Sequence, residues 1–261
     1  MSSKSVSMPW IGQPMQDMGF VVPSEEAAFS LSVCSTGREK KGKTHWAFTA
    51  PKPLACVASD TGTESVARNF RRADPRIACY TYRVPPIGQA RTEYEKEWLR
   101  LEKALTSVLL NRNIRSLVGD TWTEIWEMLR LARFGKLTQV MPMQYGPVNN
   151  EMKDIVKSLV DRPDLNCVFV HKVKKEYKTN KAGVDAWTGK FERAGFGDMG
   201  YLADVTIEHL FNPETREFGI KVLDSRYNTS QVVGNEYWGD LCNFQMLASD
   251  CFPTTDLDYW E

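Results

Sequence analysis

Short apolar runs alternate along this chain with longer segments in which apolar residues recur every three or four positions. The apolar runs span residues 29–35, 54–59, 77–83, 114–119 and 165–170. Runs of this length, closed by Pro, Gly, Asp or His, are typical of β-strands. Five strands are therefore expected before residue 171.

Helical spacing fills most of the gaps between these strands. The stretch from Thr92 to Asn111 places Tyr94, Trp98, Leu101, Leu105 and Leu109 on one face, with Glu and Lys between them. Similar spacing predicts a helix ending near Phe134 and a third helix through residues 152–159, separated by a loop at 135–147. Strands that alternate with helices predict an α/β fold, in which a mostly parallel sheet has helices on both faces.

The pattern changes late in the chain. Val205–Phe211 and Glu217–Leu223 are two strand-like runs joined by the turn-rich residues 212–216. Two runs so close together predict an antiparallel hairpin at the edge of the sheet. We therefore expect an extended N-terminal arm over residues 1–28, one α/β domain over 29–248, and an acidic C-terminal tail over 249–261.

Composition favours a globular protein and gives no sign of a membrane span. Hydrophobic residues make up 42% of the chain and charged residues 25%, which is ordinary for a globular domain. No run approaches the roughly 20 apolar residues that a spanning helix needs, and the first residues lack the apolar core of a signal peptide. We expect a cytoplasmic protein whose six cysteines are reduced, four of them lying in apolar strands.

Residues Gly37–Thr44 read G-R-E-K-K-G-K-T, which matches the phosphate-binding pattern G-x-x-x-x-G-K-[ST]. The glycines allow a tight turn that brings backbone N–H groups to phosphate oxygens, and Lys43 reaches the outer phosphates. A strand before the loop and a short helix after it supply the structural context that the motif requires. The nucleotide-binding residues predicted here are Gly37, Arg38, Glu39, Lys40, Lys41, Gly42, Lys43, Thr44 and His45.

Polar residues at the ends of later strands suggest the rest of a phosphoryl-transfer site. Asp120 ends the fourth strand and, together with the Thr44 hydroxyl, is the predicted Mg²⁺ site, although it could also cap the next helix. Glu64 or Asp60, after the second strand, could activate water, or both could belong to a solvated turn. His171 ends the fifth strand, where it could sense the terminal phosphate or be a buried structural histidine.

The segment from Lys172 to Arg193 carries seven Lys or Arg residues against three acids, although the formal net charge of the chain is zero. Its cations are interleaved with aromatic residues, the combination that single-stranded nucleic acids bind. The DNA-binding residues predicted here are Lys172, Lys174, Lys175, Lys178, Trp187, Lys190 and Arg193. A basic hairpin that only covers the nucleotide is the alternative.

The chain beyond Arg226 has six acids and no basic residue. Its last residues could dock on a basic groove, either on a partner or on the chain's own basic segment as a brake on DNA binding. Alternatively, Tyr259 and Trp260 pack the terminus onto the domain.

Taken together, residues 29–226 resemble the RecA-like AAA-type P-loop ATPases encoded by bacteriophages. The resemblance rests on the phosphate loop, Thr-Ala-Pro at 49–51, D-x-G-x-E at 60–64, D-T-x-T-E at 120–124, and the segments 130–136 and 145–149. It implies a RecA-like fold with ATP and Mg²⁺ as ligands, and it gives catalytic roles to Lys43, Glu64 and His171. Some members of this group are single-strand annealing ATPases that act with a single-stranded DNA binding protein.

The first hypothesis is therefore an ATPase that acts on single-stranded DNA in phage recombination or replication, assembled as a homo-oligomer. The interior of the phosphate loop departs from the usual small residues, because it consists of Arg38, Glu39, Lys40 and Lys41. This departure predicts slow ATP hydrolysis. Two other classes remain open: an ATP-dependent loader or clamp subunit that binds a protein and not DNA, and a small-molecule kinase.

Overall fold

A computed structural model describes residues 29–59, 61–86, 89–135, 145–179 and 185–261, together with Met15, Met18 and Gly183. The predicted N-terminal arm, Asp60, and most of the loop at 135–147 lie outside the described residues.

One eight-stranded sheet forms the centre of the molecule, with the strand order β10-β9-β8-β1-β5-β4-β2-β3. The strands are β1 (Ser32–Thr36), β2 (Leu54–Ala58), β3 (Ile77–Thr81), β4 (Ser116–Asp120), β5 (Asn166–Val170), β8 (Val205–Phe211), β9 (Phe218–Ser225) and β10 (Glu236–Trp238). β1 lies between β5 and β8 and is parallel to both. β2, β3, β4 and β5 pair in parallel, whereas β8, β9 and β10 pair antiparallel at one edge. The sheet confirms the predicted mostly parallel α/β fold with an antiparallel edge hairpin.

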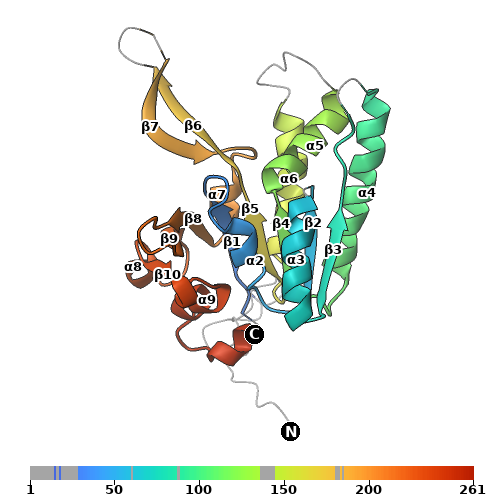
Figure 1. Ribbon diagram of the computed structural model, residues 1–261. Helices are drawn as coiled ribbons and strands as arrows, with labels where there is room; N and C mark the ends of the chain where they lie inside the picture. The colour runs from blue at the N-terminus through green and yellow to red at the C-terminus, as the bar shows by residue number, and fades with distance from the viewer. Residues whose placement is uncertain are drawn as a thin grey trace.

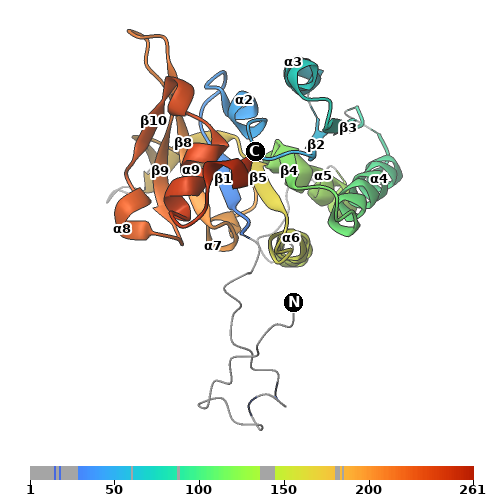
Figure 2. The same ribbon diagram turned by 90° about the horizontal axis from the view of Figure 1, so that it is seen from below.

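Helices cover both faces of this sheet, as Figure 2 shows in a view along its plane. One face carries α4 (Arg91–Leu110), α5 (Trp122–Phe134), α6 (Tyr145–Val160) and α7 (Met199–Leu202). The other carries α2 (Lys43–Ala47), α3 (Thr61–Ala73), α8 (Thr229–Val232) and α9 (Phe244–Cys251). Each face has its own core, and the side chains of consecutive strand residues alternate between the two, as a pleated strand requires.

The turn from β4 into α5 shows how the sequence fixes this packing locally. Thr121 caps α5 by accepting a hydrogen bond from the Glu124 N–H, and Trp122 begins the helix with a fully buried side chain. The Trp122 ring lies against Gly119, where a Cβ atom would approach it to 2.4 Å. A glycine at this position of β4 therefore allows the large ring to close the core directly behind Asp120.

The basic segment forms a second, two-stranded sheet of β6 (Val173–Thr179) and β7 (Asp185–Arg193). In Figure 1 this hairpin projects from the body of the molecule, on the side where β5 ends. The sequence predicted the location and polarity of the segment but assigned it no strands.

The C-terminal residues pack on the domain. Helix α9 runs across the predicted boundary at residue 248, and the Trp260 indole is fully buried among residues that include Phe244 and Phe252. The Tyr259 hydroxyl bonds both to the Phe29 N–H and to the Phe29 carbonyl, at 2.9 Å each. The last residues thus lie against the domain, where packing removes the apolar surface of their aromatic side chains from water, as in the alternative that Tyr259 and Trp260 pack the terminus.

Candidate nucleotide-binding site

The predicted phosphate loop connects β1 to α2 at the carboxyl edge of the sheet. Gly37 and Gly42 have positive φ angles of 145° and 82°, and Lys40 adopts the left-handed region at 57°. A Cβ on Gly37 would lie 3.0 Å from the Cβ of His209, which packs beneath the loop. Gly37 therefore meets two requirements at once, an unusual backbone angle and a close approach to β8.

Lys43 lies folded over its own loop. Its ammonium donates to the carbonyls of Gly37 and Arg38, at 2.8 Å and 2.6 Å. Burial lowers the pKa of Lys43 from its usual value, against the opposing effect of Asp120. The ammonium is thus held within the loop, in position to exchange carbonyl oxygens for phosphate oxygens.

Thr44 and Asp120 meet at the ends of the loop and of β4. The Thr44 Oγ1 donates to Asp120 Oδ2 at 2.8 Å, and Thr63 Oγ1 donates to the same oxygen at 2.8 Å. Asp120 is 4% exposed. A hydroxyl and a carboxylate side by side next to a phosphate loop fit Mg²⁺, which takes one or two protein oxygens and fills its other positions with water and phosphate.

These residues line a cavity of about 890 Å³, within the range of nucleotide-sized ligand pockets. Arg38, Lys40, Lys43, Arg83 and Lys172 contribute five cationic side chains to its wall. Glu39, Asp120 and Glu124 contribute three carboxylates. The excess of positive charge favours a polyphosphate.

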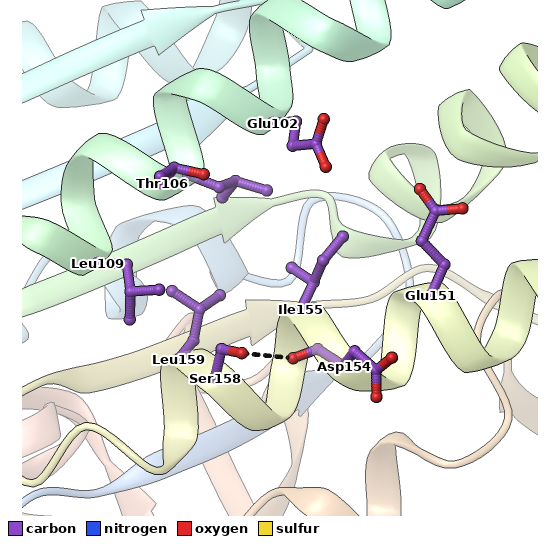
Figure 3. A pocket seen from close by; sticks show the side chains of 9 residues that line it. Glu102, Thr106, Leu109, Glu151, Asp154, Ile155, Ser158 and Leu159 are labelled. Carbon is purple, nitrogen blue, oxygen red and sulfur yellow. Dashed lines mark hydrogen bonds between the residues drawn. The ribbon is translucent and has the colours of Figure 1, made fainter.

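A second hollow, of about 280 Å³, lies between α4 and α6 (Figure 3). Leu105, Leu109, Ile155 and Leu159 form its apolar lining, and the carboxylates of Glu102, Glu151 and Asp154 lie around it. This charge is unsuited to phosphate, so the cavity beside the phosphate loop is the better candidate for the nucleotide.

Glu64, predicted to activate water, lies elsewhere. It is on α3, its Oε1 accepts a hydrogen bond from Thr81 Oγ1 at 2.5 Å, and it lines a separate hollow with Arg68 and Arg71. The structure therefore does not bring Glu64 to Lys43 and Thr44, because its position on α3 directs it towards β3.

Glu124, to which the sequence gave no role, lines the phosphate-loop cavity instead. Its carboxylate bonds to the Ser59 hydroxyl at the end of β2 and to the Lys172 ammonium at the base of the hairpin. Its backbone N–H is capped by Thr121, but its side chain points into the cavity and not back to the cap. Its place in the first turn of α5, three residues after the Thr121 cap and directly behind the strand that ends at Asp120, is the signal in the sequence that could have identified it.

Two histidines are buried beneath the site and uncharged at neutral pH. Burial lowers the pKa of His171 and of His209 to about 3. His209 Nε2 lies 2.9 Å from Ser35 Oγ, under the phosphate loop, whereas His171 Nδ1 lies 3.3 Å from the Ala194 carbonyl, under the neck of the hairpin. His171 is thus behind the cavity wall, as the structural alternative expected. His45 is exposed and packs edge-on against Phe70 at 4.7 Å.

Three exposed rings gather along the hairpin and define what we call the aromatic face: Tyr177, Trp187 and Phe191. Tyr177 pairs with Trp187 across the strands, and the Trp187 and Phe191 rings are 6.4 Å apart. Lys175 lies over the Trp187 ring at 5.2 Å, and Arg38 of the phosphate loop lies over Phe191 at 5.2 Å. The aromatic face therefore starts at the phosphate loop and continues out along the hairpin.

The predicted DNA-binding cations fall into two groups. Lys174, Lys175, Lys178 and Lys190 are exposed on the hairpin; Lys174 pairs with Glu192 and Lys178 with Glu176. Lys172 and Arg193 lie at its base, where Lys172 pairs with Glu124 and Arg193 donates to the Gly197 carbonyl at 2.5 Å and to Cys34 Sγ. Arg193 is turned inward, so the structure places it as a support of the hairpin. Lys181 lies outside the described residues.

Comparisons with known proteins give limited further information. No family model matches the chain, and no curated protein matches it. Among solved structures, one of the RadB recombinase is similar to 81% of this chain and 87% of its own, with 13% identity and a TM-score of 0.47. The mostly parallel α/β fold rests on the chain itself, in which the phosphate-loop strand β1 is separated from the Asp120 strand β4 by β5.

No helix in the described part of the chain is long and apolar enough to cross a membrane.

Proposed function

We propose that this protein is a Mg²⁺-dependent P-loop ATPase that acts on single-stranded DNA. The observation that carries the ATPase assignment is the contact between Thr44 Oγ1 and Asp120 Oδ2, beside Lys43 and the wall of a cavity large enough for a nucleotide. The residue types are those that phosphoryl transfer needs.

Each residue has a separate task in this proposal. Lys43 leaves the carbonyls of Gly37 and Arg38 for the outer phosphates of ATP. Thr44 and Asp120 hold Mg²⁺, which when bound neutralises charge on the phosphate oxygens. Glu124 accepts a proton from the attacking water, since its carboxylate lines the cavity and is held by Ser59 and Lys172.

The aromatic face supports the proposal of single-stranded DNA as the partner. Exposed rings offer stacking surfaces to bases, and the lysines beside them offer charge to the phosphates between bases. Tyr177 and Trp187 are 56% and 52% exposed, so both rings are accessible to a base. The hairpin projects from the body, so a strand could pass along it without meeting the sheet (Figure 1).

The resemblance stated above extends the proposal to phage recombination or replication, to a homo-oligomeric assembly, and to a single-stranded DNA binding protein as a second partner. If the hairpin binds a protein and not DNA, the alternative function is that of an ATP-dependent loader or clamp subunit.

The ATPase proposal is tested by Lys43→Ala, with Lys41→Ala as the matched control. Both variants remove one lysine charge from the loop, but Lys41 packs over the Phe211 ring at 4.9 Å and is outside the cavity wall. We expect ATP turnover to fall at least about tenfold in Lys43→Ala and to stay near wild type in Lys41→Ala. Equal turnover in a folded Lys43→Ala protein would contradict the proposal.

The DNA proposal is tested by measuring ATP turnover with and without a single-stranded oligonucleotide, and with a duplex of the same length. We expect the single strand to raise turnover more than the duplex. The DNA proposal is contradicted if neither DNA changes ATP turnover and labelled oligonucleotide does not bind at low salt. The protein would then be assigned to the alternative class, an ATP-dependent subunit that binds a protein.

A further inference from the structure

Two cysteines face each other at the edge of the sheet formed by β3. Cys56 on β2 and Cys79 on β3 are direct partners in the parallel register of these strands. Their side chains therefore project from the same face of the sheet, towards α3. Of the six cysteines, all of which the structure describes, Cys79 is the exposed one, whereas Cys56 is buried.

Cys79 and Cys56 have different surroundings. Cys79 lines a hollow of about 220 Å³, together with Glu64, Arg68 and Arg71. The hydrogen bond from the Cys56 thiol lowers the pKa of Cys79 and Arg71 acts in the same direction, against the opposing effects of burial and of Glu64. That same hydrogen bond, together with burial, raises the pKa of Cys56. Cys79 is thus the better nucleophile, and Cys56 is a protonated thiol within hydrogen-bond reach of it.

We propose that Cys79 and Cys56 form a two-cysteine site for reversible oxidation by hydroperoxides, with Cys79 as the reacting thiol and Cys56 as the resolving thiol. In the first step the Cys79 thiolate attacks one peroxide oxygen; the O–O bond breaks, Cys79 becomes a sulfenic acid, and the other oxygen leaves as water or an alcohol after taking a proton. In the second step the Cys56 sulfur attacks the Cys79 sulfur; an S–S bond forms, the S–O bond breaks, and the hydroxide leaves as water with the Cys56 proton. Two electrons in all pass from the two thiols to the peroxide.

Strand register supports the second step. Neighbouring strands are about 4.8 Å apart, and disulfides are observed with Cα atoms from about 4.4 Å to 6.8 Å apart. No large backbone movement is therefore needed to bring the two sulfurs into a bond. Since β3 is the edge strand, it can also adjust without disturbing a neighbour on its outer side.

The test treats the folded protein with hydrogen peroxide, then denatures it, labels the remaining thiols with N-ethylmaleimide and measures the intact mass. We expect the wild type to lose two labels together and to regain both after a reductant. Peptide mapping should recover a peptide pair joined through Cys56 and Cys79. The matched control is Cys242→Ser, because Cys242 is a half-buried thiol whose pKa is raised to about 11 by burial; this variant should still lose two labels.

Two further variants separate the roles. Cys56→Ala should stop at a Cys79 sulfenic acid that dimedone traps, and Cys79→Ala should keep all its thiols under the same exposure. In the wild type we expect Cys79 to react at least about tenfold faster than Cys242. The proposal is overturned if wild type keeps all six labels at a peroxide dose that oxidises Cys79 in Cys56→Ala, or if Cys79 reacts no faster than Cys242. Because none of these measurements uses ATP or DNA, their outcome is independent of the proposed function.

Discussion

Thr44 and Asp120 hold each other across the gap between the phosphate loop and β4. Their contact, at 2.8 Å, and the second bond from Thr63 fix the carboxylate before a metal arrives. Such preorganisation lowers the cost of binding, because little side-chain freedom is left to lose. Glu124, which lines the same cavity, is fixed in the same manner by Ser59 and Lys172.

The proposed role of Glu124 gives the first residue-scale prediction. Glu124→Gln should retain ATP affinity and lower turnover at least about a hundredfold, since an amide cannot accept the proton of water. Glu64→Gln is the matched control, because it makes the same change on α3 outside the cavity. Nucleotide binding and single-turnover hydrolysis should be measured for both. Loss of hydrolysis in Glu64→Gln alone would restore the role that the sequence suggested for that residue.

The two buried histidines predict a pH dependence of stability. The pKa of His171 and of His209 falls to about 3 in the folded protein, from an unfolded value near 6.5, so the unfolded state binds more protons between these values. Stability is then fully present above about pH 6.5 and declines as the pH falls further, by up to about 2.7 kcal/mol per pH unit for the pair.

Denaturant unfolding at pH 7.5, 6.5 and 5.5 measures this decline. His45→Gln, at the exposed histidine, should leave the profile unchanged, and His209→Gln should reduce its slope by about half. A flat profile between pH 6.5 and 5.5 would contradict a lowered pKa for both rings, and about half of the expected slope would contradict it for one of them.

At the scale of elements, the hairpin β6–β7 has rings on one face and no core beneath them. Its strands are held by the ladder between them and by a base in which Lys172 N donates to Thr123 Oγ1, at 3.0 Å, and Ala194 N donates to the Lys172 carbonyl, at 2.9 Å. The base of the hairpin is thus bonded to Thr123 on α5, the residue before Glu124. A displacement of the hairpin would therefore act on the helix that carries the candidate catalytic residue.

DNA binding by the hairpin can be tested with a charge series. Replacing Lys174, Lys175 and Lys178 with Ala should weaken binding to single-stranded DNA and lower the salt slope, log Kd against log salt, by about 2 for three lost phosphate contacts. The matched control replaces Lys96, Lys103 and Lys153, three exposed lysines on α4 and α6. Equal effects of the two triple variants would show that net charge, and not the hairpin, governs binding.

Trp187→Ala separates stacking from charge. We expect it to cost roughly 1–3 kcal/mol of DNA binding, with an unchanged salt slope. Tyr201→Ala removes another exposed ring, 86% exposed on α7, and should leave DNA affinity unchanged. A change of salt slope in Trp187→Ala would mean that the substitution moves the lysines.

Elements with at least one buried face could be predicted from the sequence, and those without one could not. The strands β1, β2, β4 and β5 are short apolar runs because both of their faces are buried. The helices α4 to α6 repeat apolar residues at helical spacing because one face of each packs on the sheet. The strands β6 and β7 have no such face, and β10 is only three residues long, so no period marks them.

The residues of the candidate site also differ in how far the sequence could predict them. Lys43, Thr44 and Asp120 were found because a loop motif and a strand end fix their positions along the chain, although their catalytic roles stay predictions. The choice between Glu64 and Glu124 depends instead on the direction in which a side chain leaves its helix. That direction follows from how α3 and α5 pack on the sheet, which no local pattern shows.

At the scale of the whole molecule, two cores share one sheet, and the last residues complete one of them. Trp260 packs between Phe244 and Phe252 at ring distances of 6.3 Å and 5.6 Å. Arg115, at the start of β4, donates to the Tyr259 carbonyl at 2.5 Å and to the Glu261 carbonyl at 3.0 Å. The C-terminus is thereby joined to the entry of both β1 and β4.

Trp260→Ala should therefore destabilise the protein by roughly 3–5 kcal/mol and lower the melting temperature by roughly 6–20 °C, with DNA affinity unchanged in the folded protein. The control is Asp256→Asn with Asp258→Asn, which removes exposed acidic charge and leaves Trp260 in place. Tighter DNA binding by the double Asn variant, at unchanged stability, would instead support the acidic brake that the sequence left open.

The central position of β1 has a consequence for the order in which the chain can fold during its synthesis. The strand that carries the phosphate loop is made early, yet its partners β5 and β8 end at Val170 and Phe211, and Tyr259 secures its entry at Phe29. While the ribosome makes the intervening residues, β1 presents two unpaired edges, and pairing must then close long loops. The unit from β2 to β4, with α3 to α5, is complete by Phe134 and could assemble first. Pulse proteolysis of nascent chains stalled after residue 134 and after residue 225 would then find the first partly protected, and the phosphate loop protected only in the second.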